Sequence, residues 1–128
     1  METLYQQLFK GGMSLTKAET VFDKPQFTDN TVNKVNNFTG ENLTTDTYYF
    51  KPDQVLAYHR HPEGDQVFFI LKGQGKFYLD NGTEEVIEVK EGSIVYVPKA
   101  VWHKLVATDG EMVACQATKS GAGMQARA

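Results

Sequence analysis

Residues 59–73 read HRHPEGDQVFFILKG and join a histidine pair to a strongly apolar run. His59 and His61 are separated by one residue, and alternate residues of a β-strand point to the same face. If this stretch is extended, both imidazoles aim at one point. The run from Gln66 to Lys72 is apolar enough to predict a strand that is covered on both faces.

The chain on either side of this stretch, from residue 43 onward, has the pattern of short strands separated by turns. Asn81-Gly82 and Asp109-Gly110 mark two hairpin turns. Many short strands without intervening long helices predict an all-β sandwich or barrel and argue against a parallel α/β sheet. The expected strands are residues 43–51, 54–61, 66–72, 76–80, 84–89, 93–97, 102–108 and 111–118.

The N-terminal residues follow a different pattern. Apolar side chains recur at an interval of four residues between Thr3 and Phe9, and glycines follow, which predicts a short amphipathic helix. Residues 14–22 are compatible with either a helix or a strand. We expect residues 1–35 to form an extension that packs on the barrel, residues 36–119 to form the barrel, and residues 120–128 to be a flexible tail.

Length and composition indicate one soluble globular domain. The chain has 128 residues, of which 41% are hydrophobic and 23% charged. The formal net charge is −3 and the lysines are scattered, which argues against a nucleic-acid-binding surface. One cysteine, Cys115, cannot form an internal disulfide. The sequence shows no signal peptide or membrane-spanning stretch, so we expect a cytoplasmic protein that does not bind membranes.

A third histidine completes a candidate metal site. His103 lies on a later expected strand, which a barrel can bring opposite His59 and His61. Three neutral imidazoles suit zinc, iron, nickel, copper or cobalt. Taken alone, a single histidine is more often a surface residue or a hydrogen-bonded core residue than a metal ligand.

The spacing of these residues resembles the two motifs of the cupin superfamily. The first motif is Gly, five residues, His-x-His, three or four residues, Glu, six residues, Gly. The second is Gly, five residues, Pro-x-Gly, two residues, His, three residues, Asn. Residues 74–91 between the motifs hold one hairpin, as in that family. Six positions match: His59, His61 and Gly73 in the first motif, and Gly92, Pro98 and His103 in the second.

The resemblance implies a fold, a cofactor and an assembly. It implies a double-stranded β-helix, the jelly-roll barrel of cupins, with one divalent transition metal (iron, nickel, zinc, manganese, copper or cobalt) held by the histidines. It also implies a homodimer, since small cupins commonly pair. The outward parity of Val67, Phe69 and Leu71 adds an apolar surface that needs covering.

The sequence departs from the cupin motifs at several positions. Asp53 stands where the leading glycine would be, and Ala100 and Ala107 replace the glycine and asparagine of the second motif. At the carboxylate position, counting back from the second glycine of the first motif gives Gln66, whereas counting forward from the histidines gives Asp65. We favour Gln66 as a fourth metal ligand, because Phe68 and Ile70 share its parity and would also point inward.

A glutamine at this position changes the chemistry that the site can perform. Glutamine has no titratable proton near neutral pH and cannot act as a base. Either the reaction needs no base from position 66, or Asp65, Tyr58 or Glu63 supplies one, or there is no reaction. Two function classes follow: a metal-dependent enzyme on a small molecule, such as a dioxygenase or an isomerase, or a non-catalytic barrel that binds a sugar-like molecule or metabolite.

Other aromatic and reactive residues have structural interpretations. Tyr48 and Tyr49 are interpreted mainly as strand core and subunit interface, with a ligand-binding wall as the alternative. Trp102 and Arg60 each neighbour a histidine and should therefore face outward. Cys115 is interpreted as a small buried apolar residue, although it could line the barrel near the metal.

Overall fold

The structure of the protein, a computed structural model, describes residues 17–128. The short helix predicted between residues 3 and 9 lies outside the described residues. None of the described residues forms a helix long and apolar enough to cross a membrane.

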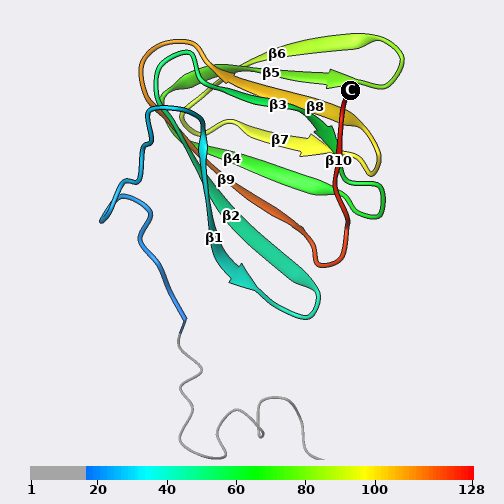
Figure 1. Ribbon diagram of the computed structural model, residues 1–128, viewed down its shortest axis with the longest axis horizontal. Coiled ribbons are helices and arrows are strands. Elements are labelled where there is room, and N and C mark those ends of the chain that lie inside the picture. The colour runs from blue at the N-terminus through cyan, green and yellow to red at the C-terminus, as the bar shows by residue number, and fades with distance from the viewer. Residues whose placement is uncertain (1–16) are drawn as a thin grey trace, which may run out of the picture.

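The described residues form two five-stranded antiparallel sheets that face each other (Figure 1). One sheet has the order β1-β2-β9-β4-β7 and the other has the order β10-β3-β8-β5-β6. The strands are β1 (Asn33–Thr39), β2 (Leu43–Phe50), β3 (Val55–Arg60), β4 (Gln66–Lys72), β5 (Gln74–Asp80), β6 (Glu84–Lys90), β7 (Ile94–Val97), β8 (Trp102–Ala107), β9 (Met112–Lys119) and β10 (Gln125–Ala126).

The eight strands expected from the sequence are all present, which confirms the all-β, double-stranded β-helix prediction. Two strands were missed. β1 has the sequence NKVNNFT, which is too polar to be recognised as a strand from its pattern, and β10 has only two residues. β4 also differs from expectation, because its outer face is only partly covered and Phe69 is 39% exposed.

The core lies between the two sheets and is built from alternate residues of the strands. Phe50, Phe68 and Phe77 are fully buried, and the rings of Phe68 and Phe77 meet edge to face with centroids 5.0 Å apart. Leu105 and Met112 fill the space around them. Phe68 and Ile70 point inward together with Gln66, as their shared parity predicts.

Two turns keep a backbone conformation that favours glycine although neither carries one. Asp53 has a φ of 68° and Ala100 a φ of 66°, and they are the non-glycine residues with positive φ in the described chain. Both stand where the cupin motifs have glycine. An aspartate and an alanine thus occupy turns whose backbone conformation disfavours residues with a Cβ atom.

Both ends of the described chain pack against the sheets. The Tyr49 hydroxyl donates to the Val21 carbonyl oxygen at 2.8 Å, so part of the N-terminal extension lies on β2. At the other end, Ala126 pairs with His59, which places β10 beside β3 in the opposite sheet from β9. The red end of the ribbon in Figure 1 follows this crossing. Part of the segment expected to be a flexible tail, residues 125–126, thus forms the short strand β10 beside His59.

Candidate metal centre

Neighbouring strands of one sheet, β3 and β8, bring the three histidines together. His59 on β3 is the direct cross-strand partner of His103 on β8, and His61 follows the end of β3. The ring centroids are 4.2 Å apart for His59 and His103, 5.2 Å for His59 and His61, and 5.6 Å for His61 and His103. One ligand atom from each ring lies within 4.8 Å of the others, which is close enough to hold a single ion.

Each imidazole is oriented by a backbone carbonyl group. Nδ1 of His59 lies 2.8 Å from the Ala57 oxygen, and Nδ1 of His103 lies 3.0 Å from the Val101 oxygen. Nδ1 of His61 lies 2.7 Å from the oxygen of Gly123, near the end of the chain. A carbonyl oxygen only accepts hydrogen bonds, so each Nδ1 carries the proton and each Nε2 keeps its lone pair.

Three nitrogen and oxygen lone pairs near this site lack a partner in the described part of the chain. Nε2 of His61, Nε2 of His103 and Oε1 of Gln66 are buried and have no hydrogen-bond partner among residues 17–128. Buried polar atoms are nearly always paired, so a group of unpaired acceptors at one place is exceptional. All three are good ligands for a divalent transition metal, and the residues therefore fit such an ion.

Burial favours the neutral form of His59 and of His103. Removal from water lowers the pKa of His59, and it lowers the pKa of His103 to about 3, with the neighbouring His59 acting in the same direction. The hydrogen bonds to Ala57 and Val101 oppose these shifts without cancelling them. Neutral imidazole is the form that binds metals.

Gln66 and Asp65, the two alternatives for the fourth ligand, have different surroundings. Gln66 is 1% exposed and lines the cavity with His59 and His61. Asp65 is exposed, accepts hydrogen bonds from the Tyr96 hydroxyl and, at 2.7 Å, from the Lys99 amide. Gln66 therefore faces the cavity, and Asp65 faces away from it.

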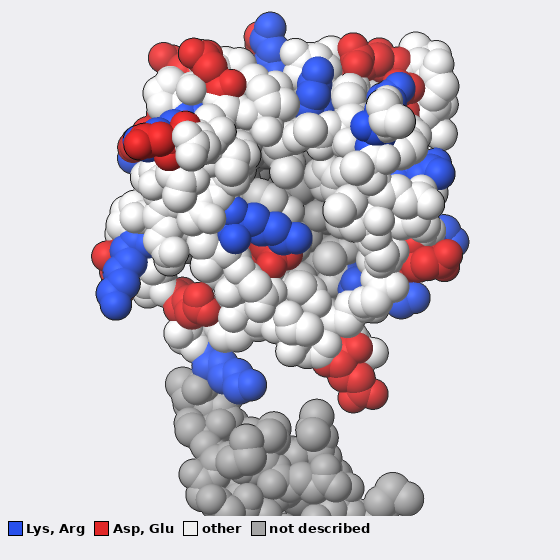
Figure 2. Space-filling view, in the orientation of Figure 1, with Lys and Arg blue, Asp and Glu red and all other residues white. Residues whose placement is uncertain are grey.

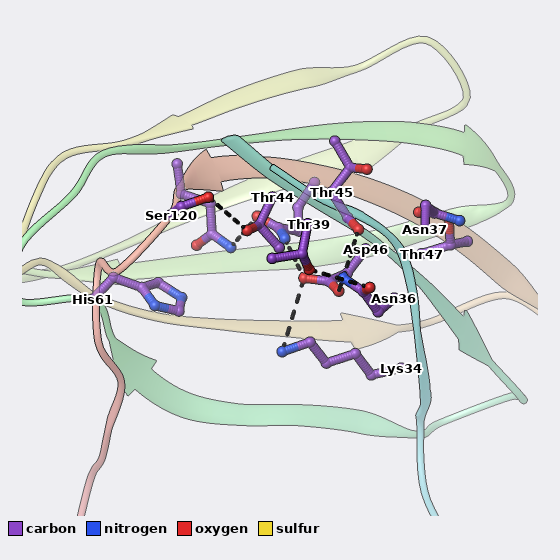
Figure 3. A network of polar contacts seen from close by, with 12 residues as sticks. Lys34, Asn36, Asn37, Thr39, Thr44, Thr45, Asp46, Thr47, His61 and Ser120 are labelled. Atoms are coloured by element: carbon purple, nitrogen blue, oxygen red, sulfur yellow. Dashed lines mark hydrogen bonds and ion pairs between the residues drawn. The ribbon is translucent and has the colours of Figure 1, made fainter. Parts of the chain in front are cut away.

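The cavity has a volume of about 560 Å³, enough for a small organic molecule. Apolar walls such as Tyr48 and Leu56 alternate with polar groups, among them Lys34 and Asp46. Figure 2 shows this face of the molecule hollowed at its centre, with basic and acidic groups in the hollow. In Figure 3, Lys34 reaches toward Asp46, and their Nζ and Oδ2 atoms are 3.9 Å apart.

Two cavity residues that sequence reasoning missed are Asp46 and Gln116. Gln66 Nε2 donates to Gln116 Oε1 at 2.8 Å, and Gln116 Nε2 donates to Asp46 Oδ2 at 2.5 Å. Strand parity could have indicated both: Asp46 shares a face with Tyr48 on β2, and Gln116 shares one with Ala114 on β9.

None of the three residues considered as alternative bases offers a free basic group to the cavity. Asp65 is bonded elsewhere, and Glu63 is exposed and does not line the cavity. Tyr58 lines it, but its hydroxyl donates to Glu84, and burial together with that carboxylate raises its pKa above the usual range. Among the described lining residues Asp46 is the single carboxylate, and it is already hydrogen-bonded.

The remaining residues singled out from the sequence lie mainly outside the cavity. Trp102 faces away from the histidines and stacks under the Arg60 guanidinium, whose carbon is 4.5 Å from the ring centroid. Cys115 is on the outer face of β9, where its Sγ lies 3.0 Å from Thr47 Oγ1. Tyr48 is both a core and a cavity residue, whereas Tyr49 faces the N-terminal segment.

Comparison with known proteins identifies the same fold and motif region. The family model described as the cupin domain matches residues 47–116, more than half of the chain. An uncharacterized protein of Methanocaldococcus jannaschii is 38% identical over 47 residues, which is 37% of this chain. The match spans 35% of that relative's length.

Solved structures match over most of the chain. A conserved protein with a double-stranded β-helix domain from Klebsiella pneumoniae superposes with a TM-score of 0.80 at 16% identity, covering 88% of this chain and 98% of its own. An RmlC-like cupin from Desulfovibrio desulfuricans superposes with a TM-score of 0.68 at 26% identity, covering 80% of this chain and 96% of its own.

Proposed function

Because the chain belongs to the cupin family, we propose that it binds one divalent transition metal ion through His59, His61 and His103, with Gln66 as a weaker fourth ligand, and that the metal binds or transforms a small molecule in the cavity. The observation that carries the proposal is the set of three carbonyl-oriented imidazoles, together with the buried, unpartnered Nε2 atoms of His61 and His103. Evolved metal sites hold their histidines in the same way.

The ligand set sets the charge of the site. Three imidazoles and an amide oxygen are all neutral, so a bound dication keeps its full charge and supplies Lewis-acid chemistry to an oxygen-bearing ligand. Lys34 adds a further positive charge at the cavity, next to Asp46. We therefore expect a small molecule with an anionic or strongly polar oxygen to bind best.

The protein's own residues favour chemistry without a base. Gln66 cannot take a proton, and Asp46 is separated from Gln66 by Gln116. The residues around the cavity instead bind and orient: Tyr48 and Leu56 supply apolar walls, and Lys34 supplies a cation. A dioxygenase-like reaction or an isomerisation remains compatible with this set only if the ligand or the solvent carries the proton.

A second candidate is a barrel that binds a sugar-like molecule or metabolite without turnover. It is favoured by the same lack of a free carboxylate among the described residues that line the cavity. Small-molecule binding that survives loss of the histidines would distinguish the metal-independent barrel from the metal-dependent protein.

We also propose that the protein is a cytoplasmic homodimer.

The decisive experiment is elemental mass spectrometry on untagged protein beside a His59→Ala, His103→Ala double variant. Near-stoichiometric iron, nickel, zinc, copper, manganese or cobalt in the wild type, lost in the double variant, is expected. Lys104→Ala is the matched control, since Lys104 follows His103 on β8 but stacks on Tyr58 and Tyr78. No metal in the wild type after reconstitution would leave only the metal-independent barrel.

A further inference from the structure

Three buried polar side chains lead from the histidine site across one sheet. Gln66, Gln116 and Asp46 are 1%, 2% and 4% exposed and come from β4, β9 and β2, which are neighbouring strands. Two hydrogen bonds link them in series, from Gln66 to Gln116 and from Gln116 to Asp46. Burial of such a series of polar groups is costly unless each group is paired. The series ends at Oε1 of Gln66, which has no partner among the described residues.

Asp46 sets the direction of this series. Asn36 Nδ2 donates to its Oδ1 at 3.0 Å, and the Lys34 ammonium lies beside its Oδ2 (Figure 3). A carboxylate only accepts hydrogen bonds, so Gln116 must turn its NH₂ group toward Asp46. Gln116 then offers its carbonyl oxygen to Gln66.

The same logic orients the amide of Gln66. Its NH₂ group is required by the Gln116 oxygen, and its own carbonyl oxygen is left on the opposite side of the amide. An isolated glutamine could present either end to a neighbouring ion, and the NH₂ end would repel a cation. The hydrogen-bond direction that Asp46 imposes excludes the orientation in which the NH₂ group of Gln66 faces the ion.

We propose that Asp46 and Gln116 are positioning residues that hold the Gln66 amide with its carbonyl oxygen free to bind the metal. The inference rests on the metal site proposed above. It assigns a function to two residues outside the cupin motifs, and it explains how a glutamine serves at a position where the family pattern has a carboxylate.

The proposal predicts an unusual dependence between positions 46 and 66. In Gln66→Glu, the new carboxylate faces the Gln116 oxygen, and turning Gln116 around would bring that oxygen against Asp46. Asp46→Asn in the same chain removes the conflict, because the new NH₂ group can donate to Gln116, which can then donate to the new carboxylate. Gln66→Glu alone therefore contains a mismatched pair, whereas the double variant contains none.

The test is isothermal titration calorimetry, in which the dissociation constants of Zn²⁺ and Mn²⁺ are measured at pH 8 for the wild type, Gln66→Glu, Asp46→Asn and the double variant. Gln66→Glu should strengthen metal binding at least about tenfold more in the Asp46→Asn background than in the wild type. An equal gain in the two backgrounds would overturn the proposal.

Plain repulsion between two carboxylates could also couple these positions, so the four titrations are repeated with Gln116→Met. Methionine keeps the length of the side chain but donates no hydrogen bond. The proposed arrangement requires the coupling to vanish in this background, while direct charge repulsion would leave it intact and refute the role of Gln116.

Urea unfolding of the metal-free proteins gives a readout that does not depend on metal binding. Gln66→Glu should have a lower unfolding midpoint than the wild type, and the double variant should recover most of the loss. Absence of metal binding by the wild type would count against the proposed function. The urea cycle would then decide the orientation of Gln66, because no recovery would contradict it.

Discussion

The backbone amide of Ala100 donates a hydrogen bond to the carbonyl oxygen of His61 at 2.9 Å while Ala100 holds a φ of 66°. This turn before β8 thus supports a histidine of the proposed metal site from outside the cavity. It does so with a side chain that disfavours the required backbone conformation.

Ala100→Gly is expected to stabilise the protein. An alanine in the left-handed conformation destabilises the folded state by about 1–2 kcal/mol, and glycine removes this strain. The greater conformational freedom of glycine in the unfolded chain offsets about 0.5–1 kcal/mol of the stabilisation. The free energy of unfolding in urea should rise by roughly 0.5–1 kcal/mol. Asp53→Gly is the matched comparison and should gain less, because aspartate tolerates this conformation better. A loss of stability in Ala100→Gly would show that the turn is not strained.

Gly73→Ala should destabilise the fold strongly. Gly73 has a φ of 84°, and a Cβ atom there would lie 2.2 Å from the Glu111 oxygen and 2.9 Å from the Met112 Cα. Both are backbone atoms that cannot move aside, so we expect a loss above about 3 kcal/mol in urea unfolding. Gly82→Ala separates the two causes, since its φ is 99° but nothing lies within 4 Å of the added Cβ. Equal losses in the two variants would mean that the clash contributes nothing.

Removal of residues 121–128 is expected to weaken metal binding about 10–100-fold. The deletion removes the Gly123 carbonyl that orients Nδ1 of His61. It also removes the Ala122 carbonyl, which accepts a hydrogen bond from the Glu63 amide at 2.9 Å. The measurement is a Zn²⁺ titration of the folded truncate, with a deletion of Ala128 alone as control. Unchanged affinity would show that His61 needs no support from the C-terminal segment.

The contact between Arg127 and Asp80 should make the attachment of the C-terminal segment sensitive to acid. A guanidinium nitrogen of Arg127 lies 2.8 Å from Asp80 Oδ2, and this hydrogen bond lowers the pKa of Asp80 below 3.8. Because the folded-state pKa is depressed, the stabilisation is complete above pH 3.8 and is lost as the pH falls through the lower folded value. Urea midpoints of wild type and Asp80→Asn should therefore differ at pH 6 and converge toward pH 2. A constant difference would exclude this titration.

The outer edge of one sheet is the expected surface of the proposed homodimer. β7 is the last strand in its sheet, and its Ile94 and Tyr96 side chains are 66% and 56% exposed beside Phe69 on β4. Sedimentation equilibrium should give twice the mass of one chain, and Ile94→Lys should give the mass of one chain. Val86→Lys, on the edge strand of the other sheet, is the control and should stay dimeric. A wild-type mass equal to that of one chain would contradict the proposed homodimer.

Local patterns in the chain were enough to predict most of the fold. Strand period, hairpin glycines and the spacing of His59, His61 and Gly73 indicate a cupin barrel with a three-histidine site. The alternation of side chains also favoured Gln66 over Asp65, and Gln66 is the residue that lines the cavity. These inferences succeed because the direction of a side chain on a strand depends only on its immediate neighbours.

The partners of these residues depend on tertiary structure. Gln66 and Gln116 are 50 positions apart, Gln116 and Asp46 are 70 apart, and His61 and Gly123 are 62 apart. Each pair meets because the chain places β2, β9 and β4 side by side and returns its end to β3. Strand order and register arise from how the whole core packs, and no local period encodes them.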